Sequence, residues 1–106
     1  MISISHHAMD QFCDRLHLPC RICHNQAMTA WRYGIRHAET RGGLNRYISG
    51  IYLRYRTANN VRISQGLVWV FCGSVLVTVW QLPGCFHQHV RSALRRRDLA
   101  GWRAAA

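Results

Sequence analysis

The feature that most constrains this chain is a long stretch without formal charge. No Asp, Glu, Lys or Arg occurs between Arg62 and Arg91. Its most apolar part, Leu67 to Leu82, has 16 residues, slightly fewer than a membrane-spanning helix usually needs. It is interrupted by Gly73-Ser74 and is rich in Val, Phe and Trp, which favours buried β-structure. We therefore expect a buried β-hairpin and no membrane association, with a membrane helix as the minor alternative.

An alternation of apolar and polar residues extends this region towards the N-terminus. It runs from Val61 to Ser64, and the turn sequences Gln65-Gly66 and Cys72-Gly73-Ser74 divide the residues that follow. The pattern predicts a three-stranded antiparallel meander within residues 59–83. A short strand at Ile2–Ile4 is expected to join an edge of this sheet as a fourth strand.

The strongest helical periodicity lies before the meander. Apolar residues recur there at the spacing of one helix face, and they are Leu44, Tyr47, Ile48, Ile51, Tyr52 and Tyr55. Gly50 weakens this helix by about 1 kcal/mol relative to Ala. The preceding segment, Ile35 to Gly43, is polar and ends in two glycines, so we expect a loop there.

Three further helices are expected. Ser5 is a good N-cap for a first helix, which Pro19 brings to an end. A second helix is predicted from Cys20 to Tyr33, and a basic helix from His87 to Leu99. The sequence thus predicts one α+β domain, mainly helical over residues 1–57, with a meander over 59–83 and a basic helix over 86–100. We expect one face of the sheet to pack on the N-terminal helices.

The charge balance indicates a polyanionic partner. All fourteen basic residues other than histidine are arginines, only four acidic residues oppose them, and the formal net charge is +10. Arginine matches phosphate with a planar fork and stacks on bases, although GC-rich coding also raises arginine content. The candidate nucleic-acid contacts are Arg46, Arg54, Arg56, Arg62, Arg91, Arg95, Arg96 and Arg97, and a solvated basic face is the alternative. Tyr52, Tyr55 and Trp69 are interleaved with them, either as base-stacking rings or as core.

One candidate site for chemistry lies on the first helix. His7, Gln11 and Arg15 are spaced i, i+4 and i+8, so one helix face would present an imidazole, an amide and a guanidinium. A histidine can move protons and an arginine can stabilise phosphate charge, which together would suit RNA cleavage. His6 is an alternative imidazole, and an inert polar face is the simpler explanation.

Two runs of the sequence resemble a known family. They are ISHHAMDQFCDRLHL and NNVRISQGLVWVFCGSVLVTVWQLP, which look like the DUF4258 domains of bacteria and phages, grouped with RelE-like and colicin-type ribonuclease toxins. By position, the family's His-Ala…Arg helix falls on His7, Ala8 and Arg15, and its last strand on 77–79. The resemblance covers about half the chain, and the helix from Leu44 to Tyr55 departs from it.

The cysteines suggest two cofactors that we do not expect. Cys20-Arg21-Ile22-Cys23-His24 has the spacing of a c-type haem attachment motif. That attachment follows export, however, and the first residues have neither the basic start nor the apolar run of a signal peptide. A zinc site is the other alternative, with four ligands drawn from Cys13, His17, Cys20, Cys23 and His24, but no second CxxC pair is present. Five cysteines, an odd count without a secretion signal, indicate a reducing cytoplasm. We expect plain buried or surface thiols there, with no cofactor and no metal.

These observations predict a small cytoplasmic protein that interacts with RNA and resembles a metal-independent ribonuclease toxin. His7 would be the acid or base, Arg15 and Arg54 would hold phosphate, and Thr78 would support them. A protein antitoxin is then an expected partner. The alternative is a non-catalytic phage or mobile-element protein that binds nucleic acid or a nucleoprotein complex, such as an inhibitor of a defence system.

Overall fold

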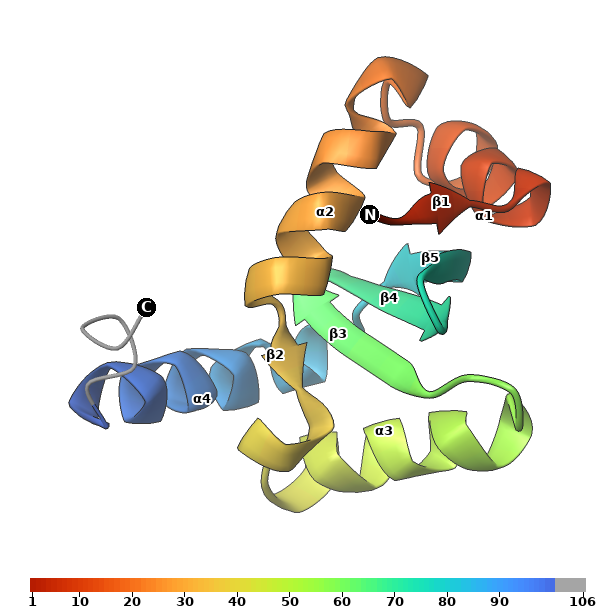
Figure 1. Cartoon of the computed structure of the whole chain (residues 1–106). Helices are drawn as coiled ribbons and strands as arrows, with labels where there is room; N and C mark the ends of the chain where they lie inside the picture. Colours follow the sequence, from red (N-terminus) through yellow and green to blue (C-terminus); the bar gives the residue numbers. More distant parts are fainter. Residues whose placement is uncertain (101–106) are drawn as a thin grey trace.

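Five strands form one mixed sheet in the order β1-β5-β4-β3-β2 (Figure 1). The structure is a computed structural model and describes residues 1–100 of the chain. The strands are β1 (Ser3–Ile4), β2 (Ile35–Arg36), β3 (Asn60–Ser64), β4 (Leu67–Cys72) and β5 (Val75–Gln81). β1 runs parallel to β5, and the other neighbouring pairs are antiparallel. The α+β class is confirmed, but the sheet has five strands and mixed direction where we expected three or four antiparallel ones.

The helices occupy the predicted parts of the chain. They are α1 (His6–Asp10) with a π-helical continuation (Gln11–Arg15), α2 (Cys23–Tyr33), α3 (Gly42–Arg54) and α4 (His87–Leu99), with short 3-10 turns at Cys20–Ile22, His37–Glu39 and Gly84–Phe86. The Ser5 hydroxyl accepts a hydrogen bond from the Ala8 amide at 3.1 Å, as expected of an N-cap. Within residues 1–100, no helix has the length and hydropathy needed to cross a membrane.

Helices cover both faces of the sheet, with α1 and α2 on one side and α3 and α4 on the other (Figure 1). β4 alternates between the two cores: Trp69 and Phe71 pack with α1 and α2, whereas Val68 and Val70 pack with α3 and α4. One face thus packs on N-terminal helices as expected, but the second helical layer on the other face was not predicted. A strand that is apolar at every position, as β4 is, is buried on both sides.

The expected loop from Ile35 to Gly43 contains an edge strand instead. In β2, Ile35 pairs with Ile63 of β3, and Arg36 pairs with Arg62. Ile35 is buried in the α3/α4 core. This strand has only two residues and depends on a distant partner, so no local periodicity marks it.

Two cysteines are joined, contrary to the expectation of free thiols. A disulfide links Cys13 to Cys20, and the free cysteines are Cys23, Cys72 and Cys85. The bond closes a short loop between the first helix and α2. Neither bonded sulfur is then a thiolate, so the zinc alternative loses two of its ligands. The described part of the chain contains no group of three or more His, Cys, Asp or Glu side chains that could hold a metal.

Candidate nucleic-acid interface

Two hollows of the molecular surface meet at the turn between β3 and β4. They have volumes of about 420 and 480 Å³, and both are lined by Gln65, Gly66 and His87. We call their combined surface the turn groove. The first hollow is completed by Tyr33, Ile35, Ile63, Ser64, Leu82, Val90, Arg91 and Leu94, and the second by Arg15, Leu16, His17, Leu18, Gln26, Leu67 and Gln81.

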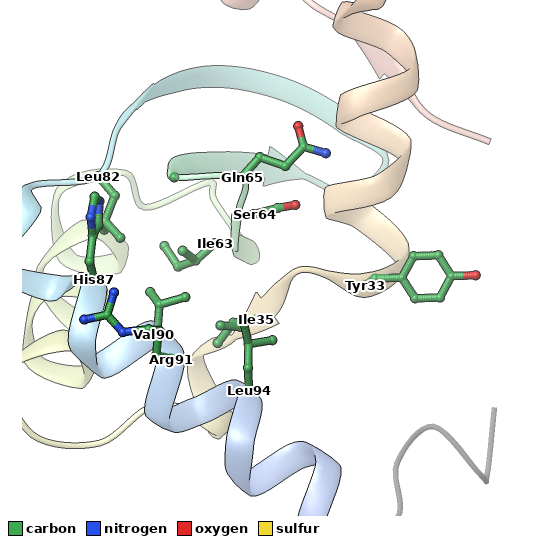
Figure 2. A pocket seen from close by; sticks show the side chains of 11 residues that line it. Tyr33, Ile35, Ile63, Ser64, Gln65, Leu82, His87, Val90, Arg91 and Leu94 are labelled. Carbon is green, nitrogen blue, oxygen red and sulfur yellow. The ribbon is translucent and has the colours of Figure 1, made fainter.

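The first hollow has an aliphatic floor and a polar rim. Figure 2 shows the side chains of Ile63, Val90 and Leu94 gathered at its centre, with His87 and Arg91 on one side. α4 contributes His87, Val90, Arg91 and Leu94 to this hollow, and β3 contributes Ile63. Leu94 is 43% exposed, so part of this aliphatic floor faces solvent.

The second hollow carries most of the basic groups of the groove. Arg15 is the last residue of the π-helical turn, and His17 follows it with a left-handed backbone, at a φ of 55°. Both side chains are exposed. His87 begins α4 at the opposite end of the chain and lines the same hollow. A guanidinium and two imidazoles therefore surround one space.

The turn groove is cationic because no acid balances its arginines. Among the described residues that line it, none is Asp or Glu. Arg15 lies in one hollow and Arg91 in the other. An acid-free groove with arginines in both of its parts attracts phosphates.

The four predicted catalytic residues do not form one site. The His7 ring lies beside the Gln11 amide, at 3.4 Å between their Nε2 atoms, on α1. Arg54 ends α3, which covers the opposite face of the sheet. Thr78 is buried and pairs with Val70, so its side chain lies on the α3 side of the sheet. Of the four predicted catalytic residues, only Arg15 lines the turn groove.

Of the eight candidate arginines, one lines the groove, four are exposed elsewhere and three contact other parts of the protein. Arg91 lines the groove, while Arg46, Arg54, Arg56 and Arg95 are exposed outside it. Arg62 is partly buried with its guanidinium 5.8 Å from the Trp31 ring centre, and this burial lowers the pKa of Arg62. Arg96 donates to the Glu39 carbonyl at 3.0 Å, and Arg97 forms a largely buried ion pair with the same residue. The structure thus uses Arg97 to hold the fold together, and its guanidinium is not available to phosphate.

The aromatic candidates lie mainly in the core. Trp69 is fully buried and donates from its ring to the Ser64 carbonyl at 3.1 Å. The Tyr52 hydroxyl accepts from the Val61 amide, which satisfies an edge group of β3. Tyr55 remains 41% exposed and stacks on Trp80, outside the turn groove. No aromatic residue that was expected to bind bases therefore lines this groove.

Two other hollows lie against α4 and differ in chemistry. They share Arg41 and Arg96, and one of them also contains Glu39. The charges there are partly paired within the protein, since Arg36 and Arg97 both form ion pairs with Glu39. The turn groove is for this reason the better candidate for an external polyanion.

Sequence reasoning missed two residues of the turn groove. His17 entered only the zinc alternative, and no role in a site was predicted for His87. No local pattern could connect Arg15 and His17 with His87 and Arg91, because the two pairs lie far apart in the chain and meet only in the folded structure. The nearest signal was the pair of histidines at 87 and 89.

No protein-family model matches this chain, and comparisons with curated proteins and with solved structures also find no match.

Proposed function

We propose that this protein binds RNA through the turn groove. The observation that supports it is an acid-free surface in which Arg15 and Arg91 line adjoining hollows. The net charge of +10 would attract a polyanion over a longer range and raise the rate of encounter. Arginine forks would then hold the backbone phosphates without reading sequence.

A salt titration tests this proposal directly. Fluorescence anisotropy of a labelled RNA oligonucleotide should show binding by the full chain at low salt. The logarithm of the affinity should fall linearly with the logarithm of salt, by about 0.7 for each phosphate contact to a single strand. RNA that stays unbound at low salt, or an affinity that does not change with salt, would contradict the proposal.

Cleavage of the bound RNA is a second candidate function. His17 and His87 both line the hollow that contains Arg15. One imidazole could remove the proton of a ribose 2′-hydroxyl while the other protonates the leaving 5′-oxygen. The 2′-oxygen then bonds to phosphorus as the bond to the 5′-oxygen breaks, which yields a 2′,3′-cyclic phosphate and a 5′-hydroxyl. Arg15 would stabilise the charge on the phosphoryl oxygens.

Product analysis in EDTA separates cleavage from binding. If the enzyme proposal holds, cyclic-phosphate ends form, and His17→Ala or His87→Ala removes them. His7→Ala is the matched control because His7 lies on α1 and does not line the groove. RNA that is bound but remains intact would favour the non-catalytic alternative, a binder of nucleic acid or of a nucleoprotein complex.

A further inference from the structure

We propose that the apolar hollow of the turn groove receives an unpaired base, so that the ligand is single-stranded RNA. This inference rests on the proposed function and specifies the form of RNA that the groove accepts. Its starting point is the contrast between the two hollows. One presents Arg15 and two histidines, whereas the other presents an aliphatic floor.

The aliphatic floor cannot serve a phosphate. Ile63, Val90 and Leu94 offer no donor to an anion, and a charged group would lose hydration against them. Figure 2 places these three side chains together, with the Arg91 guanidinium at one side of them. The surface therefore suits a molecule with an apolar body next to an anionic group.

A nucleotide has this combination of parts. The faces of a base are apolar, its edges form hydrogen bonds, and its phosphate is anionic. Ser64 and Gln65 lie on the rim of the hollow, where their polar groups can meet a base edge. The volume of about 420 Å³ falls within the usual range of ligand pockets, about 300 to 1,000 Å³.

The position of the hollow requires the base to be unpaired. In a duplex, the faces of a base are stacked and its pairing edge is occupied, so it cannot enter a surface hollow. In a single strand, one base can turn into the hollow while neighbouring phosphates lie along Arg15 and Arg91. Gln65 and His87 line both hollows, so the two hollows adjoin at these side chains.

The test compares three labelled RNA probes of equal length on the full-length protein. They are a single strand, the same strand in a duplex, and an abasic strand that keeps the ribose-phosphate backbone but has no bases. We expect the affinity for the single strand to be at least about fivefold higher than the affinity for the abasic strand or the duplex. Equal affinity for all three would overturn this inference and leave the proposed function standing. Failure of every probe to bind would overturn both.

A pair of matched variants locates the effect. Leu94→Ser should reduce single-strand affinity to the level of the abasic strand, without changing abasic affinity. Leu53→Ser is the control, because Leu53 is 78% exposed on α3 and lies outside the groove. Thermal unfolding of both variants checks that they fold. Unchanged single-strand affinity in Leu94→Ser would overturn the proposed base site.

Discussion

Arg97 donates two hydrogen bonds to the carboxylate of Glu39, from Nε to Oε2 at 2.8 Å and from Nη2 to Oε1 at 2.7 Å. The same guanidinium donates to the backbone carbonyls of Tyr33 and Gly34. Arg97 lies on α4, and the residues that it contacts lie at the end of α2 and in the turn after β2. One arginine of a strongly basic chain thus joins three segments of the fold.

Replacing this arginine should destabilise the protein. Arg97→Ala would leave the Glu39 carboxylate, which is 18% exposed, without its main partner. We expect a loss of about 2 to 4 kcal/mol in the free energy of unfolding. Urea denaturation measures it, with Arg95→Ala on the exposed side of α4 as the control for loss of charge. Equal midpoints for the two variants would show that the ion pair contributes little.

The same pair should make stability depend on pH. Burial raises the pKa of Glu39, but hydrogen bonds from Arg97 and the Arg36 amide, with the charges of both arginines, outweigh it and lower the pKa below its ordinary value of 4.5. The folded state therefore binds this proton less readily than the unfolded state, and the stabilisation is present in full above the unfolded pKa. It should be lost as pH falls through the folded pKa.

Glu39→Gln isolates that contribution. The difference in stability between the original protein and this variant should be constant near neutral pH and should shrink in acid, below the ordinary pKa of Glu39. Urea titrations at several pH values provide the measurement. A difference that stays constant down to strongly acidic pH would contradict the lowered pKa.

Gly34 should not tolerate a side chain. A Cβ at this position would lie 2.5 Å from the Ala30 carbonyl oxygen and 2.8 Å from the Cβ of Arg62. Gly34→Ala should therefore cost about 1 to 3 kcal/mol through overpacking. Gly50→Ala is the opposite control: nothing lies within 4 Å of its Cβ inside α3, so it should stabilise the helix by about 1 kcal/mol. Thermal melts that rank the two variants the other way would contradict this packing.

The disulfide should stabilise the folded protein. Closing the loop from Cys13 to Cys20 limits the unfolded state, which is worth about 2 to 3 kcal/mol. Reduction or Cys13→Ser should lower the melting temperature accordingly. Alkylation of the unfolded, unreduced protein should modify Cys23, Cys72 and Cys85 and leave the other two cysteines unmodified. Modification of all five without reductant would show that the bond is not formed.

The location of the RNA contacts can be tested with two double variants that have the same net charge. Arg15→Gln with Arg91→Gln removes two arginines of the turn groove, and Arg46→Gln with Arg54→Gln removes two exposed arginines of α3. We expect the groove variant to lose affinity and to reduce the salt slope by about 0.7 for each lost phosphate contact. The α3 variant should change both quantities much less. Equal losses in the two variants would indicate a diffuse basic surface instead.

Local patterns in the sequence were sufficient for most elements of the fold. The apolar face at Leu44, Ile48 and Ile51 is buried as the helical spacing predicts. The turns at Gln65-Gly66 and Gly73-Ser74 separate β3, β4 and β5 as expected. Each of these features depends on residues a few positions apart, so the sequence determines them without knowledge of the tertiary structure.

The sequence also contained a signal other than the alternation of apolar and polar residues. β4 is apolar from Leu67 to Phe71 without alternation, and such a strand is buried on both faces. This pattern could have predicted the second helical layer. It could not have predicted which helices form it, because that depends on the connections around the sheet.

By itself, then, the sequence determined most of the elements, the α+β class and the strong positive charge, all of which follow from local spacing and composition. The tertiary structure alone decided that β2 joins the sheet, that Cys13 pairs with Cys20 and that Arg97 is used internally. It also separated His7 from Arg54 and brought Arg15 and His17 to one hollow with His87 and Gln65. Apart from the disulfide, these relationships join residues far apart in the chain, and only the packing of both helical layers on one sheet determines which of them meet.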